Sequence, residues 1–197
     1  MAGNQKNREF TGEELKGGRY TETVYEGCKF YGANLRFTEF KQCKFKSCDF
    51  SGCKPDQTWF EECEFTETKL ANLDMEEINL KGCNFDKAVA VNSIFQKFKG
   101  REKLVRKHWD LTSCRFAGAD LTGSIFVDCN LAKANFNRAN LERTVFEKCD
   151  LRNADLTGAN IDGTNFEGSK TEGAKLDLSG FIRFGNSKGF VLGETET

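Results

Sequence analysis

Residues 114–163, written in blocks of five, read CRFAG ADLTG SIFVD CNLAK ANFNR ANLER TVFEK CDLRN ADLTG ANIDG. The third residue of every block is Phe, Leu or Ile, and the first is Cys, Ala, Ser or Thr. Residues two apart in an extended chain share a face, so the small and the large residue of a block point the same way. Because an odd repeat reverses that face, each block must contain one bend that returns its large residue to the inside. The stretch therefore predicts a closed coil with a corner in every block.

The same spacing covers nearly the whole chain. Large apolar residues, called centres below, stand at almost every fifth position from 10 to 95 and, after a slip of one residue, from 111 to 176. Similar residue types also recur every 20 positions, as in the row Phe45, Phe65 and Phe85. Four blocks per turn explain that second period, and stacked turns would lie about 4.8 Å apart. The 32 centre positions then fill at most eight turns of a four-sided β-helix. The positions that break the pattern are Pro55, Ala90 and Thr171.

The composition favours a binding protein over an enzyme. Of the 197 residues, 30% are charged and 38% are hydrophobic, and the chain holds 19 Phe but only one Pro and one His. A lone histidine, His108, leaves little for acid–base or metal chemistry, and no nucleotide-binding or hydrolase motif is present. We therefore expect no enzymatic activity, no cofactor and no metal. The net charge of −1 gives no overall attraction for nucleic acid, and no apolar stretch is long enough to span a membrane.

The cysteines share one position in the repeat, the small inward residue two before a centre. Their spacings of five do not match the C-x-x-C pattern of zinc and redox sites. The pattern predicts free thiols that fill the core, and their odd number indicates a reducing, cytoplasmic compartment. The nine residues are Cys28, Cys43, Cys48, Cys53, Cys63, Cys83, Cys114, Cys129 and Cys149.

The spacing fails between Phe95 and Leu111, which are 16 positions apart. Three blocks with a bulge, or one block with an 11-residue insertion, would fill this gap. Polar residues such as Lys103 do not suit the core, so we expect an insertion at about 96–110, with a short helix over 101–109. Six cations against two carboxylates give the segment a charge of +4 and leave −5 for the rest of the chain. It is either a solvated loop pinned to the coil by its apolar residues or a recognition loop. The expected partner contacts are Lys97, Lys99, Arg101, Lys103, Arg106, Lys107 and Trp109.

A second irregularity lies at Pro55, a proline at a centre position. Because proline has no N–H to donate and fixes its own φ, one hydrogen bond between turns is lost there. We expect a distorted, exposed corner that carries further partner contacts, Asp56 and Trp59.

From residue 178 the periodicity becomes helical, with apolar side chains at 178, 181 and 182 on one face. Asp177 or Ser179 would cap this helix, Gly189 would end it, and the apolar residues 190–192 would form a short strand. The chain thus divides into a β-helix over 1–177, interrupted at about 96–110, and a C-terminal module over 178–197. The module either covers the last coil or makes a two-fold interface, and we expect both. The expected dimer contacts are Leu178, Phe181, Ile182, Phe190, Val191 and Leu192.

Blocks such as ADLTG at 119–123 and 154–158 and CDFSG at 48–52 resemble those of pentapeptide repeat proteins. The resemblance covers nearly the whole chain and implies an all-β fold, a right-handed quadrilateral β-helix. That fold supplies a binding surface rather than an active site. It also implies that the Asp or Asn before each centre lies on a solvated face.

The central insertion and the helical tail resemble the Qnr and MfpA quinolone-resistance group within that family. This resemblance implies a homodimer that binds a bacterial type II topoisomerase, DNA gyrase or topoisomerase IV, and protects it from quinolones. The resemblance also implies a DNA mimic that makes no direct contact with nucleic acid. The lysines of this chain, such as Lys41, Lys44 and Lys69, make its body less acidic than a mimic requires. The alternative is a repeat scaffold that binds another protein and has no topoisomerase role.

Overall fold

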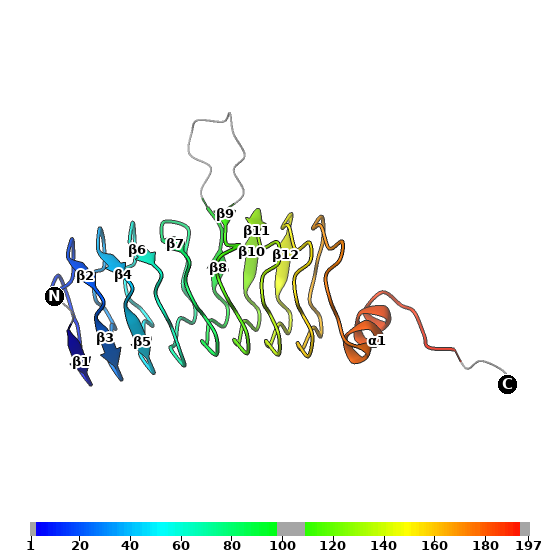
Figure 1. The fold of residues 1–197 in the computed structure, drawn as a ribbon, viewed down its shortest axis with the longest axis horizontal. Coiled ribbons are helices and arrows are strands. Elements are labelled where there is room, and N and C mark those ends of the chain that lie inside the picture. The colour runs from blue at the N-terminus through cyan, green and yellow to red at the C-terminus, as the bar shows by residue number, and fades with distance from the viewer. Residues whose placement is uncertain (1–2, 98–108, 194–197) are drawn as a thin grey trace, which may run out of the picture.

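The computed structural model describes residues 3–97 and 109–193. They form a parallel β-solenoid of about seven turns, and one short helix, α1 (Leu178–Ser187), follows the last turn. Figure 1 shows a straight rod with the N-terminus at one end and α1 at the other. The four-sided β-helix expected from the sequence is confirmed.

Short parallel strands stack along the rod, one from each turn (Figure 1). Paired residues lie 20 apart, as in Tyr20 with Phe40 and Phe126 with Phe146, which is the spacing that four blocks per turn require. One sheet contains β1 (Asn4–Lys6), β3 (Val24–Glu26) and β5 (Lys44–Lys46), and a second contains β2 (Arg19–Thr21), β4 (Glu39–Lys41), β6 (Trp59–Glu61) and β7 (Asn79–Lys81). The third contains β8 (Ile94–Phe95), β10 (Ile125–Val127) and β12 (Val145–Glu147), and the fourth contains β9 (Trp109–Asp110) and β11 (Cys129–Asn130).

The centres form a column of stacked side chains inside the rod. Between turns the rings lie face to face, with centroids 4.2 Å apart for Phe30 and Phe50. Within a turn they meet edge-on, as Phe45 and Phe50 do at 5.1 Å and 77°. Both arrangements are favourable for aromatic pairs. Since a flat ring fits the spacing between turns of about 4.8 Å, this core explains the abundance of phenylalanine.

Each corner is made by the residue two positions after a centre. Nearly all of these residues have a positive φ, for example 65° at Gly123 and 62° at Phe37. Glycine adopts this conformation without steric cost because it has no Cβ. Phe37 is bulky and exposed, so it is an unusual residue at such a corner.

The small inward position does more than fill space. All nine cysteines are free and buried, as predicted. In addition, hydroxyl and thiol groups at this position donate to the carbonyl of the centre one turn earlier. Thr58 Oγ1 donates to the Leu35 carbonyl at 2.8 Å, and Cys129 Sγ contacts the Phe95 carbonyl at 3.3 Å. These bonds explain why Thr, Ser and Cys alternate with Ala here, which the sequence reasoning missed.

Replacing Tyr25 with Phe is expected to stabilise the protein. Tyr25 is 1% exposed, and its hydroxyl has no hydrogen-bond partner among the described residues. Its burial also raises the pKa of Tyr25 well above the usual value. An unpaired buried hydroxyl costs about 1 kcal/mol or more, so Tyr25→Phe should raise the free energy of unfolding by about that amount in urea titrations.

The matched control is Phe45→Tyr, because the Phe45 ring stacks on Tyr25 at 4.9 Å. This variant adds a second buried hydroxyl to the same column and should lower the free energy of unfolding. A Tyr25→Phe protein less stable than the parent would show that the hydroxyl has a stabilising partner.

Candidate functional site

The register of the turns locates the insertion. Phe95 pairs with Phe126, whereas Trp109 pairs with Cys129, so the chain contains 11 more residues between Phe95 and Trp109 than its partner turn requires. This register fits one block with an 11-residue insertion. The helix was expected over 101–109, and all of this range except residue 109 lies outside the described residues. Five of the expected contacts also lie outside them. Those contacts are Lys99, Arg101, Lys103, Arg106 and Lys107.

The other two expected contacts, Lys97 and Trp109, lie at the root of the insertion and face the coil. Trp109 is 8% exposed and occupies the small inward position of its block. The Lys97 ammonium lies 4.8 Å from the centroid of the Trp109 ring and donates to the Ile78 carbonyl. Burial lowers the pKa of Lys97 to about 8, against the attraction of Glu77 and Glu76. This contact joins the two residues that flank the insertion.

The corner at Pro55 is distorted, as expected. Parallel bridges join Asn34 to Lys54 and Asp74 to Ile94, but none joins Lys54 to Asp74. A groove of about 200 Å³ lies beside this interruption. The groove is lined by Pro55, Asp56, Asp74, Glu76, Glu77 and Ile78.

Two large aromatic side chains are exposed near this corner. Trp59 is 55% exposed in β6, and Phe37 is 50% exposed. The Phe37 amide donates to the Asp56 carbonyl at 3.4 Å, so Phe37 and Asp56 lie on adjacent turns. The sequence reasoning selected Asp56 and Trp59 but missed Phe37. An aromatic residue at a corner position where glycine is common was the available signal.

The outward Asp and Asn residues brace the corners. The side-chain oxygen of most of them accepts from the backbone N–H two residues later, as Asp120 does from Thr122 at 3.1 Å. Asp150 accepts from the Arg152 backbone and also from its guanidinium, with Nη2 at 2.6 Å. These carboxylates therefore hold the backbone and are only partly available to a ligand.

The lysines noted in the sequence neutralise carboxylates one turn away. Lys41 lies 3.3 Å from Glu61, and Lys44 lies 3.2 Å from Glu64. Ion pairs of this exposed kind contribute little to stability. Their main effect is to leave no continuous acidic stripe on the sides that carry them.

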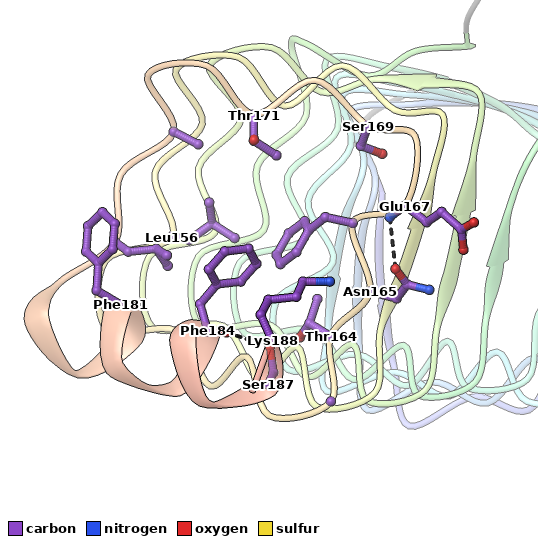
Figure 2. Close-up of a pocket in the computed structure, with 14 residues that line it drawn as sticks. Leu156, Thr164, Asn165, Glu167, Ser169, Thr171, Phe181, Phe184, Ser187 and Lys188 are labelled. Atoms are coloured by element: carbon purple, nitrogen blue, oxygen red, sulfur yellow. Dashed lines mark hydrogen bonds between the residues drawn. The ribbon is translucent and has the colours of Figure 1, made fainter. Parts of the chain in front are cut away.

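The C-terminal helix covers part of the last coil. Asp177 caps it, with Oδ1 accepting from the Gly180 N–H at 2.7 Å, and the Phe184 ring meets that of Phe166 at 6.1 Å. Figure 2 shows Phe181 and Phe184 projecting from the helix toward the end of the coil. A groove of about 790 Å³ remains between helix and coil.

Apolar side chains of the module remain exposed, and Phe181 among them lines this groove. Leu178 is 78% exposed and Phe181 is 59% exposed. Ile182, Phe190, Val191 and Leu192 are also exposed. The strand expected over 190–192 does not form. A strand needs a neighbour to pair with, and the amide of Phe190 donates instead to the Gly185 carbonyl at the helix end.

Within 3–97 and 109–193, no three His, Cys, Asp or Glu side chains are grouped so as to hold a metal ion. The helix in the same ranges is too short to cross a bilayer.

Comparison with known proteins identifies the repeat and the fold. Residues 107–176 match the family model of the pentapeptide repeat region, and residues 5–90 match that of the SV2A/B/C luminal domain. A trypsin-treated form of QnrB1, a plasmid-mediated fluoroquinolone resistance protein, superposes with a TM-score of 0.61 at 20% identity, covering 98% of this chain and 100% of that one. Full-length QnrB1 superposes with a TM-score of 0.57 at 19% identity, covering 95% and 98%. No curated protein sequence matches. The resemblance to pentapeptide repeat proteins and the right-handed quadrilateral β-helix are confirmed.

The Asp150 brace predicts a specific response to acid. The hydrogen bond from Arg152 lowers the pKa of Asp150 from its usual 3.8 to about 2. Because the folded pKa is depressed, the stabilisation is present above pH 3.8 and is lost as the pH falls toward 2. Urea midpoints between pH 5 and 2.5 should therefore fall less steeply for Asp150→Asn than for the parent protein.

The control is Asp56→Asn, which removes an exposed carboxylate at the Pro55 corner and should follow the parent curve. If Asp150→Asn also gave the parent slope, the Arg152 contact would not contribute to acid sensitivity.

Proposed function

We propose that this pentapeptide repeat protein binds a bacterial type II topoisomerase, DNA gyrase above all, and protects it from quinolone-type inhibitors. The observation that carries the proposal is the match to QnrB1 along almost the full length of both chains. The central insertion and the C-terminal helix give further support, since the sequence resemblance to the Qnr and MfpA group rests on them.

The surface charge supports recognition by particular contacts more than mimicry of a whole DNA duplex. A duplex carries one negative charge per about 1.7 Å of its axis. On this rod many carboxylates are paired with lysines one turn away or are occupied in bracing corners, as for Glu61 and Asp150. A DNA-mimicking stripe would therefore be short.

The insertion is the proposed recognition element. Its charge of +4 would favour an acidic region of the partner, and Lys97 with Trp109 anchors it to a rigid coil. A loop on a rigid scaffold is a common arrangement for binding. We further propose that the protein acts in the cytoplasm, where its nine thiols stay reduced. The alternative partner is another protein without a topoisomerase role.

Removing residues 98–108 should abolish protection without unfolding the coil. The deletion joins Lys97 to Trp109 and restores the 20-residue register, since the insertion adds 11 residues to one turn. Gyrase supercoiling with a fluoroquinolone should be rescued by the parent protein and not by the deletion variant. The melting temperatures of the two proteins should be nearly equal.

A charge-reversal variant tests whether the cations of the insertion, and not only its length, are needed for recognition. Arg101→Glu with Arg106→Glu and Lys107→Glu should weaken protection, most strongly at low salt. The control is Lys133→Glu with Arg138→Glu and Lys170→Glu, which makes the same change of net charge elsewhere on the coil. If the parent protein neither rescued nor altered supercoiling, the topoisomerase proposal would fail and the scaffold alternative would stand.

We also propose that the C-terminal module forms a homodimer. Leu178 and Phe181 expose apolar area, Phe181 beside an open groove, and residues 190–192 are exposed and form no strand. A two-fold interface would cover both. The module would thus act as cap and dimer contact together.

Placing a charge on this apolar face should produce monomers. Phe181→Glu should shift sedimentation at tens of micromolar from dimer to monomer, because a buried unpaired carboxylate is costly. The control is Tyr31→Glu, the same kind of change at an exposed aromatic residue near the other end of the rod, and it should remain dimeric. A monomeric parent protein would leave only the capping role.

A further inference from the structure

One side of the coil differs from the other three in how its outward residues interact. We call it the insertion side, because Lys97 and the insertion follow one of its centres. Its centres are Leu15, Leu35, Pro55, Met75, Phe95, Phe126, Phe146 and Phe166.

On the other three sides, ion pairs link successive turns between residues 6 and 115. These pairs are Glu9–Lys29, Asp49–Lys69, Arg19–Glu39, Lys41–Glu61, Glu61–Lys81, Lys6–Glu26, Lys44–Glu64 and Asp86–Arg115. On the insertion side, no such pair joins the described residues that directly precede or follow the centres. The carboxylates there interact within a turn instead, as Glu147 does with Lys148 at 2.8 Å and Asp74 with the Glu76 N–H at 2.9 Å.

The middle of the insertion side carries an apolar stripe. Ile94, Ile125 and Val145 each precede a buried Phe in β8, β10 and β12, and they are in register with one another. Val127 lies beside them on the same side. Each of the four is partly exposed, whereas polar residues hold most equivalent positions elsewhere. Three turns at about 4.8 Å give a stripe roughly 10 Å long.

Carboxylates lie at both ends of this stripe. Asp74 is bridged to Ile94 from the turn before, and it lines the Pro55 groove with Glu76. At the other end Glu147 is in register with Val127, and Glu167 follows one turn later. The insertion side therefore presents an apolar centre between two acidic ends.

We propose that the insertion side is a docking surface for an extended segment of a partner protein with apolar residues at its centre and Lys or Arg at both ends. The apolar stripe would bury the central side chains, and the carboxylates at each end would attract the flanking cations. The partner is defined here by its chemistry, so the proposal goes beyond the topoisomerase function and does not depend on it.

The exposed corner residues extend this surface toward the N-terminus. Trp59 and Phe37 are exposed near one corner of the coil. This corner forms an edge of the insertion side and lies next to the Pro55 groove. Exposed aromatic faces attract cations and are frequent at the centres of interfaces. The two irregularities of the sequence, Pro55 and the insertion, thus border one continuous surface.

The test uses a fluorescein-labelled peptide, Lys-Lys-Val-Thr-Ile-Thr-Val-Arg-Arg, and the full-length protein in fluorescence anisotropy. Alternate Val, Ile and Val side chains share one face of the extended peptide, with cations at both ends. We expect saturable binding that weakens with added salt, and no binding of the same peptide with Glu at both ends.

Variants identify the surface. Ile94→Thr with Ile125→Thr and Val145→Thr keeps β-branched residues in the strands and should raise the Kd about tenfold or more. Glu76→Gln with Glu147→Gln should raise the Kd and flatten its salt dependence. The control, Glu142→Gln with Glu172→Gln, removes two carboxylates from neighbouring sides and should bind as the parent does.

Several results would overturn the proposal. One is the absence of saturable binding, and another is an equal Kd for the parent and the Thr variant at an unchanged melting temperature. If only the 98–108 deletion variant bound the peptide, the surface would be occupied by the chain's own insertion. If the Thr variant changed the oligomeric state, the surface would be a contact between copies of this chain.

Discussion

The stacking of each centre on the centre one turn away is the interaction on which the rest of the structure depends. It holds because backbone bonds between turns keep the register, as in the bond of 2.7 Å from the Phe30 amide to the Asp49 carbonyl. That register favours a small residue two positions before each centre, although Leu73, Ile78 and Trp109 are also buried at this position. Thr, Ser and Cys meet this preference, and their donors reach the carbonyl of the earlier turn, as Thr58 does. The core, the corners and the backbone hydrogen bonds between turns therefore form one cooperative unit.

The outer surface of the rod is divided between structure and recognition. Asp and Asn before the centres hold the corners, and lysine–carboxylate pairs link the turns on three sides. The side that carries Pro55 and the insertion lacks those links among the residues beside its centres, and instead it exposes Ile94, Ile125 and Val145. Residues that form no ion pair between turns are the ones proposed to meet a partner. This division explains why the proposed contacts concentrate on one side.

Much of this protein was determined by the sequence alone. A period of five with a second period of 20 predicted the four-sided coil, the inward thiols and the 11-residue insertion, because a stacked core allows only one face for large residues. The helix and its Asp177 cap followed from local periodicity and capping chemistry. These features depend on residues that are near in sequence or repeat at a fixed interval, so a linear pattern contains them.

Only the tertiary structure decided which residues meet across turns. Trp109 looked like a loop residue, but the register places it at an inward position under Lys97. The strand expected over 190–192 needed a neighbour that the single chain does not supply there. The apolar stripe was also invisible as a run, since Ile94, Ile125 and Val145 are 31 and 20 residues apart and become adjacent only when the turns stack. Contacts of this kind depend on the number of residues in each complete turn, including the insertion. A local sequence pattern does not show that number.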